Sequence, residues 1–205
     1  MRAVWTLSAL AAGLWFVMFS PWTREAILFW PAMSLSCGLL ALAGLWLNRH
    51  WPREVFAFRW WHVPVGVFSA LVLYLMFFVG HRIAGAILPF ASEQIALVYR
   101  TRSQADLWLI GVLLFAWVGP AEEIFWRGCV QRRCGQRFGA FTGLALTAAI
   151  YTLVHIWSFN LMLLAAAGLC GVFWGAMFWR FRSIWPALIS HAVWDVVIFV
   201  LLPIR

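Results

Sequence analysis

The feature that most restricts the fold is a succession of seven apolar runs, each near the ~20 residues that cross about 30 Å of hydrocarbon. They cover residues 3–20, 26–47, 63–89, 107–130, 138–157, 160–179 and 184–203. Only helices suit such runs, because an unpaired strand edge cannot be satisfied in lipid. The chain is 65% hydrophobic and 11% charged, whereas a soluble domain carries about 25% charged residues. We therefore predict an all-α polytopic transmembrane helical bundle of about seven spans, forming a single domain over residues 1–205.

Most of the charge lies in the short gaps between the apolar runs. The net charge is +8, and all fifteen basic residues are arginines. Arginines placed in this way fit anionic lipid headgroups better than a nucleic acid, so we expect a bilayer and no nucleic-acid partner. Seven spans put nine arginines on the side of the N-terminus and four on the other side. This asymmetry predicts a cytoplasmic N-terminus, in what we expect to be a bacterial inner (plasma) membrane.

Two adjacent carboxylates and an arginine interrupt the fourth apolar run. Glu123 and Arg127 are four residues apart, so they share a helix face and can form an ion pair. Glu122 lies about 140° around the helix from Arg127 and points elsewhere. Charges at membrane depth usually pair, face the bundle interior and mark a function. The spacing indicates that Arg127 neutralises Glu123 and leaves Glu122 available as a general base. A buried Glu–Arg bridge that only fixes helix register is the alternative.

Pro120 directly precedes this pair of glutamates. Proline has no backbone N–H and tends to kink or restart a helix. A half-helix starting there would hold both glutamates in its first turn, at the end of the helix dipole that favours negative charge. The proline therefore predicts a kink or a restart of the helix within the fourth span.

Two histidines lie in later apolar runs. His155 follows Tyr151 by four residues, and Asp195 follows His191 by four. The Asp195 carboxylate can accept from one imidazole nitrogen of His191 and fix its tautomer, as in the base-plus-orienter unit of many active sites. Either motif could equally be a satisfied structural group. Counted from the predicted helix ends, Glu122 and His191 lie about 8–10 Å from the cytoplasmic surface and His155 about 24 Å from it. The fifth span must therefore start elsewhere, tilt or be staggered.

Together, the motifs EExxxR, aromatic-xxx-His and Hxxx(Asn/Asp) form a more specific pattern. In this order over residues 107–203, they resemble the CAAX prenyl protease and bacteriocin-processing (CPBP, or ABI) family of glutamic-type intramembrane proteases. The resemblance implies a helical bundle with the three motifs around a cavity inside the membrane. The spans within residues 1–90 have no assigned role.

The resemblance also implies roles for six residues. Glu122 would be the base that activates water, with Glu123 and Arg127 supporting it. His155 would assist the water, while His191 and Asp195 would face the oxyanion. Asp195 stands where eukaryotic members carry Asn, and an ionised Asp cannot donate to an oxyanion. Either Asp195 is protonated or it orients His191, and we favour the second. Tyr151 replaces a common Phe, a difference that we expect to be harmless.

Metal dependence and function each leave two hypotheses. Glu122, His155 and His191 could bind zinc with an open fourth position, but the HExxH helix signature is missing. We favour water activation without a metal, and we expect no cofactor. The favoured function is an endopeptidase that hydrolyses a membrane-anchored protein or peptide near the bilayer surface. The family resemblance implies C-terminal processing of exported proteins as one form that this activity could take. The alternative is a non-enzymatic bacteriocin immunity or transport component whose buried charges are structural.

Overall fold

The computed structural model describes residues 1–48 and 53–204, and within them every regular element is helical. The first half contains α1 (Arg2–Phe19), η1 (Arg24–Ala26), α2 (Phe29–Leu47), α3 (Arg53–Phe56), α4 (His62–Ile87), α5 (Ala91–Tyr99) and η2 (Arg100–Gln104). The second half contains α6 (Leu107–Leu113), η3 (Leu114–Val118), α7 (Gly119–Glu123), η4 (Ile124–Gln131), α8 (Arg132–Phe138), α9 (Ala140–Leu153), η5 (Ile156–Ser158), α10 (Leu161–Phe181), α11 (Trp185–Val196) and η6 (Val197–Leu201).

Six of these helical segments are long and apolar enough to cross a membrane, and a shorter apolar helix occupies residues 185–201. This arrangement confirms the predicted polytopic helical bundle. Large apolar side chains such as Leu35, Phe68 and Ile87 are exposed, at 75%, 66% and 69%. Outward-facing apolar residues suit a surface in contact with lipid rather than water.

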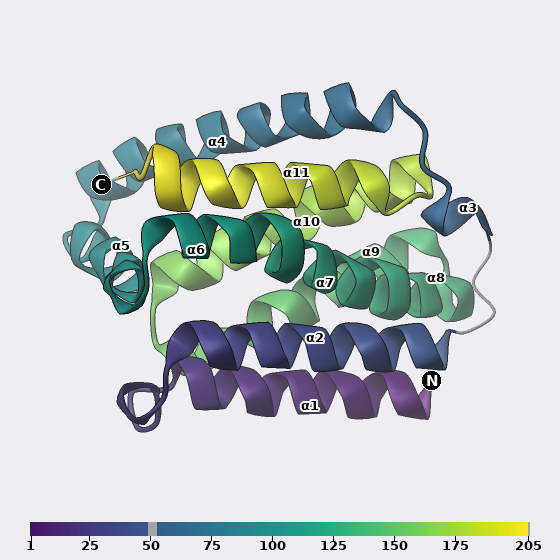
Figure 1. Ribbon diagram of the computed structural model, residues 1–205, viewed down its shortest axis with the longest axis horizontal. Coiled ribbons are helices and arrows are strands. Elements are labelled where there is room, and N and C mark those ends of the chain that lie inside the picture. The colour runs from purple at the N-terminus through teal and green to yellow at the C-terminus, as the bar shows by residue number, and fades with distance from the viewer. Residues whose placement is uncertain (49–52, 205) are drawn as a thin grey trace.

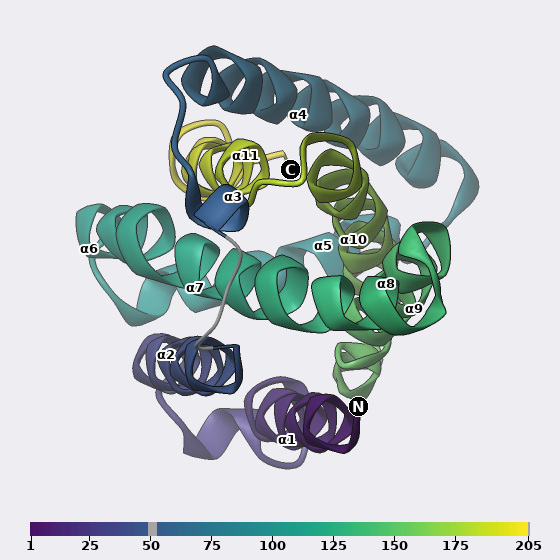
Figure 2. The ribbon, with the colours of Figure 1, turned by 90° about the vertical axis from the view of Figure 1, so that its right-hand side faces the viewer.

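The helices form a bundle in which one long segment crosses between two pairs (Figures 1 and 2). The α1–α2 hairpin lies on one side, and α4 packs along α11 on the other. The continuous segment α6–η3–α7–η4–α8 runs obliquely between them, while α9 and α10 pack together beside it. The two ends of the chain lie at opposite ends of the bundle (Figure 1). The glutamate pair, at the middle of the oblique segment, is therefore enclosed on all sides by helices.

Glycine permits the closest approaches between these helices. A Cβ on Gly66 of α4 would lie 2.6 Å from the Ile189 side chain of α11. On α10, a Cβ on Gly171 would lie 3.2 Å from the Tyr151 ring and 3.3 Å from the Ala148 backbone of α9. Small residues allow this kind of backbone contact between membrane helices. The second contact matters for the site, because it presses α9 and the Tyr151 ring against α10.

The fourth span differs from the prediction in its end and in its continuity. It extends to Phe138 rather than to residue 130, and it does not restart at Pro120. Instead, the π-helical turn η3 precedes the proline, and the Gly119 N–H bonds to the carbonyl of Leu114. A wider turn of this kind re-satisfies the backbone groups around a proline. The two glutamates therefore lie inside a continuous helix and not in the first turn of a new one.

The extended span also removes the conflict between the predicted depths of Glu122 and His155. Gly139, with φ of 93°, makes the turn between α8 and α9. Glu122 precedes this turn by about as many residues as His155 follows it, so both lie roughly 24–26 Å along their helices from the turn. The predicted distance of about 8–10 Å for Glu122 was wrong because it was counted from residue 130. Glu122 and His155 can now face the same interior space.

Candidate active site

Glu123 is the centre of a buried network of charges. Its Oε1 atom accepts hydrogen bonds from Arg127 Nη1 at 2.9 Å and from His191 Nδ1 at 2.8 Å. Glu123 and Arg127 are both fully buried. The Arg127 Nη2 group reaches the carbonyls of Cys170 and Gly171 on α10, at 3.3 and 3.4 Å. The predicted ion pair is therefore present, and it joins α7 and η4 to α10 and α11.

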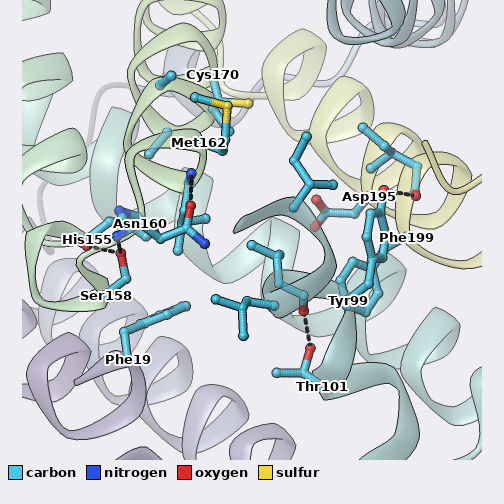
Figure 3. Close-up of a pocket in the computed structure, with 18 of the residues that line it drawn as sticks. Phe19, Tyr99, Thr101, His155, Ser158, Asn160, Met162, Cys170, Asp195 and Phe199 are labelled. Carbon is cyan, nitrogen blue, oxygen red and sulfur yellow. Dashed lines mark hydrogen bonds between the residues drawn. The ribbon is translucent and has the colours of Figure 1, made fainter. Parts of the chain in front are cut away.

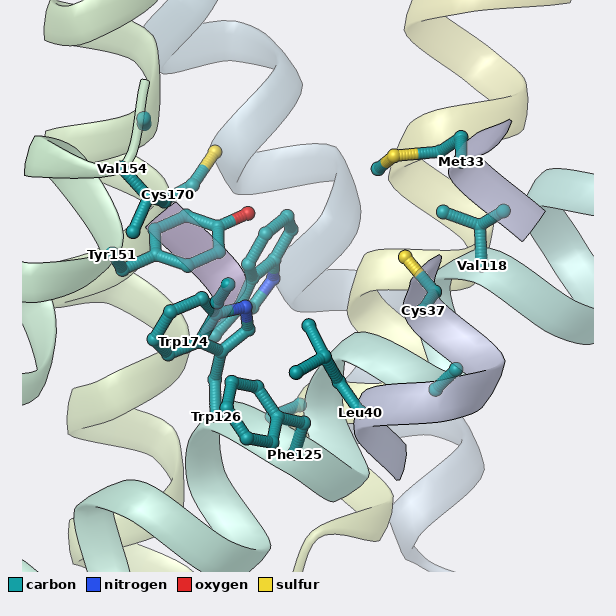
Figure 4. Packing of buried hydrophobic residues seen from close by; sticks show 14 of the residues in the cluster. Met33, Cys37, Leu40, Val118, Phe125, Trp126, Tyr151, Val154, Cys170 and Trp174 are labelled. Carbon is teal, nitrogen blue, oxygen red and sulfur yellow. The ribbon is translucent and has the colours of Figure 1, made fainter. Parts of the chain in front are cut away.

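Glu122 points away from this network, as its position around the helix predicted. Its Oε2 atom accepts a hydrogen bond from the Tyr151 hydroxyl at 2.9 Å. Its Oε1 atom lies 4.0 Å from the sulfur of Cys37 on α2. Figure 4 shows Tyr151 and Cys37 approaching the core from different helices. Glu122 thus has one strong protein partner, and its carboxylate lines a cavity.

His155 has protein partners at both ring nitrogens. Nδ1 lies 2.8 Å from the Tyr151 carbonyl, and Nε2 accepts from the indole N–H of Trp15 at 3.0 Å. A carbonyl only accepts and an indole N–H only donates. The ring is therefore the neutral tautomer with its proton on Nδ1. Trp15 belongs to α1, which lies outside the motif-bearing half of the chain.

His191 is held between two carboxylates and against an indole. While Nδ1 contacts Glu123, its Nε2 atom lies 3.4 Å from Asp195 Oδ2. The imidazole stacks on Trp174 with 3.7 Å between ring centroids and 18° between planes. Trp174 in turn donates from its indole to Ser190 Oγ at 3.2 Å. The predicted proximity of His191 and Asp195 is present, but Glu123 is the closer of the two carboxylates that orient the ring.

These groups meet at one large cavity of about 1020 Å³. Glu122, Tyr151, His155, His191 and Asp195 all line it. Figure 3 shows His155 and Asp195 on facing sides of the cavity, with Tyr99, Thr101 and Asn160 also on its wall. Much of the remaining wall is apolar and comes from α4 and α10. The structure therefore brings Glu122 and both histidines, with Asp195, to a common interior surface, while Glu123 and Arg127 lie behind it.

The arrangement does not fit the zinc set that the sequence left open. A zinc ligand needs a free lone pair on an imidazole nitrogen. On His155, Nδ1 carries the proton and Nε2 faces the Trp15 N–H. Within residues 1–48 and 53–204, no three His, Cys, Asp or Glu side chains are placed to hold a metal ion. Zinc binding by Glu122, His155 and His191 would require Trp15 to move away first.

Three contributors were missed in the sequence. Trp15 is one of sixteen tryptophans, and nothing local distinguishes it from those that face lipid. Cys37 and Trp174 lie within apolar runs, where no charged neighbour in the sequence marks them as part of a site. For Tyr151 a signal did exist, because a hydroxyl stands where the family commonly has a bare ring. The expectation that this difference is harmless did not foresee the hydrogen bond to Glu122.

Comparison with known proteins gives a family match in the second half of the chain. Residues 104–197 match the family model described as "Type II CAAX prenyl endopeptidase Rce1-like". The match covers α6 to α11 and includes all three motifs, and it confirms the family resemblance predicted from them. No curated protein and no solved structure matches the chain significantly.

Proposed function

We propose, from the premise that residues 104–197 belong to the Rce1-like family of type II CAAX prenyl endopeptidases, that this chain is an intramembrane endopeptidase. Its substrate would be a membrane-anchored protein or peptide. The observation that carries the proposal is the contrast between the two glutamates. Glu123 is fully committed to Arg127 and His191, whereas Glu122 lines the cavity with only Tyr151 as a strong partner.

Glu122 would serve as the general base. A water molecule between its carboxylate and the scissile carbonyl would give a proton to Glu122 as the oxygen attacks the carbonyl carbon. The same carboxyl would then return the proton to the leaving amine, which balances the hydrolysis. The hydroxyl of Tyr151 would hold the carboxylate in one orientation during both transfers. No step in this scheme uses a metal ion.

His191 would stabilise the negative charge that develops on the carbonyl oxygen. A ring that donates through Nδ1 to Glu123 must carry a second proton on Nε2 to donate to an oxyanion. Two flanking carboxylates, Glu123 at 2.8 Å and Asp195 at 3.4 Å, supply the countercharge for such an imidazolium. Asp195 would therefore act by orienting and balancing His191, not by donating to the oxyanion itself.

The alternative function is a non-enzymatic membrane protein in which the same charges hold the helices together. One observation favours this alternative: the network of Glu123, Arg127 and His191 joins three separate parts of the bundle. Glu122 distinguishes the two hypotheses, because it is not part of that network. A purely structural site has no need of a carboxylate that faces a cavity.

The test compares wild type with Glu122→Gln in detergent, by thermal melting and by cleavage of membrane-tethered peptides. Glutamine can still accept from Tyr151 but cannot take a proton from water, so we expect unchanged melting and lost cleavage. Glu93→Gln, the same change outside the cavity lining, is the matched control and should leave both unchanged. Full cleavage by Glu122→Gln would refute the proposal, and a variant that fails to fold would support the structural alternative. We expect a chelator to leave wild-type cleavage unchanged.

A further inference from the structure

The cavity has its mouth at one particular end of the bundle. Apart from the deep site residues, its lining comes from the segment after α1, the start of α2, the second half of α4, α5 and η2, α10, and residues 198–204. Residues at this mouth include Arg24, Arg100, Ser103, Gln104, Ser158 and Asn160. In Figure 1 this end carries α5 and the C-terminus, opposite to the end that carries the N-terminus. The cavity is therefore reached from the end remote from the N-terminus.

The route from the other end is closed by packed side chains. Every residue from Phe125 to Gln131 is buried, and none of them lines the cavity. Trp126 and Phe125 are 0% and 1% exposed, and Figure 4 shows both in the core beneath Tyr151. Among the described residues, nothing from α3, α8 or the α10–α11 connection contributes to the cavity wall. The cavity is therefore closed toward the N-terminal end of the bundle.

Arginines distinguish the two ends of the bundle. The N-terminal end carries eight arginines of the described chain, at positions 2, 53, 59, 132, 133, 137, 180 and 182. The mouth end carries four, at positions 24, 82, 100 and 102, and these are accompanied by Glu25, Glu93 and Asp106. Arginine-rich ends of membrane bundles remain in the cytoplasm. This asymmetry assigns the N-terminal end to the cytoplasm and the cavity mouth to the opposite face.

We propose that the cavity opens to the non-cytoplasmic face of the membrane, so that its substrate is an exported, membrane-anchored peptide presented from that side. The assignment of the open face stands on the cavity and the arginines alone. The assignment of the substrate rests in addition on the proposed peptidase function. A substrate anchored by an apolar segment matches a wall in which Ile83, Ile87, Met162 and Leu163 lead from the mouth toward the polar site.

Cysteine labelling tests the open face without any use of activity. The four native cysteines are buried, so the wild type provides the blank. Ser103→Cys places a thiol at the mouth, and Gln136→Cys places one at the N-terminal end. Both positions are exposed, and neither change removes an arginine. With a membrane-impermeant maleimide on intact spheroplasts, we expect Ser103→Cys to react at once and Gln136→Cys only after permeabilisation.

The proposal is overturned if Ser103→Cys reacts only after permeabilisation, whether or not Gln136→Cys reacts before it. It is also overturned if both variants react with the maleimide on intact spheroplasts. The substrate assignment is tested with two tethered reporters that carry the same cleavable peptide on either side of one anchor helix. We expect wild type to cut only the outward-facing peptide, and Glu122→Gln to cut neither. Cutting of the inward-facing peptide would overturn the proposed side while supporting the peptidase function. If neither reporter is cut but the labelling is as expected, the peptidase function fails and the open face stands.

Discussion

Removal of Arg127 should destabilise the bundle strongly, because it would leave the carboxylate of Glu123 buried without its arginine partner. The Arg127 side chain is fully buried and lies 2.9 Å from Glu123 Oε1. Breaking a buried ion pair by removing one partner costs about 3–5 kcal/mol. The two bonds from Arg127 to carbonyls on α10 are long, at 3.3 and 3.4 Å, and add little. We therefore expect Arg127→Met to lower the free energy of unfolding by about 3–5 kcal/mol.

The Glu123→Gln change should recover part of that loss. Once the arginine is gone, an uncharged amide is cheaper to bury than an unpaired carboxylate. The amide oxygen can still accept from His191 Nδ1, which now lies 2.8 Å from Glu123 Oε1. The double variant should thus be more stable than Arg127→Met alone, with a coupling energy of roughly 0.5–3 kcal/mol between the two sites.

Reversible unfolding in a titration with denaturing detergent, followed by tryptophan fluorescence, measures these free energies. Arg137→Met is the control, because Arg137 is exposed and its loss should change stability by less than about 0.5 kcal/mol. A loss below about 1 kcal/mol for Arg127→Met would contradict the reasoning. So would a double variant whose loss equals the sum of the two single losses, since the charges would then not depend on each other.

Two further variants test the immediate surroundings of Glu122 and His155. Tyr151→Phe keeps the ring but removes the hydroxyl bonded to Glu122. Because a hydrogen bond to a carboxylate contributes about 1.5–3 kcal/mol, we expect kcat for peptide cleavage to fall at least about 10-fold with little change in KM. An unchanged kcat would exclude a positioning role for Tyr151. Trp15→Phe leaves Nε2 of His155 unpaired and should cost about 1–3 kcal/mol of stability without increasing the cleavage rate. A faster enzyme would show that Trp15 restrains a catalytic histidine.

The sequence predicted those features that depend on local spacing. Apolar length predicted the six helices that can span a membrane and the shorter apolar helix over residues 185–201. A spacing of four residues predicted both the Glu123–Arg127 pair and the proximity of His191 to Asp195. Such pairs follow from the helix itself, whatever the rest of the fold does. The same argument correctly separated Glu122 from Glu123. Local geometry was therefore sufficient to identify which glutamate is free.

Errors arose where contacts between distant segments decide the local structure. The arginine-rich residues 132–137 were taken as the loop after a span, but they continue the helix as α8. Arg133 bonds to Asn48 Oδ1 and to the Leu47 carbonyl at the end of α2, both at 2.7 Å. These bonds give the Arg133 guanidinium two acceptors and satisfy the Leu47 carbonyl in the last turn of another helix. No pattern within residues 132–137 could reveal a partner more than eighty positions earlier in the chain.

His155 shows why the first spans belong to the site although the family match begins at residue 104. Helix α9 ends at Leu153, and the Nδ1 proton of His155 satisfies the carbonyl of Tyr151 in its last turn. Trp15 fixes this tautomer by donating to Nε2, so neither nitrogen is left for water. We therefore propose that His155 holds the backbone that carries Tyr151, whose hydroxyl donates to Glu122. On this proposal, His155 acts on Glu122 through two successive hydrogen bonds and not directly on water, and Trp15 of α1 fixes its tautomer.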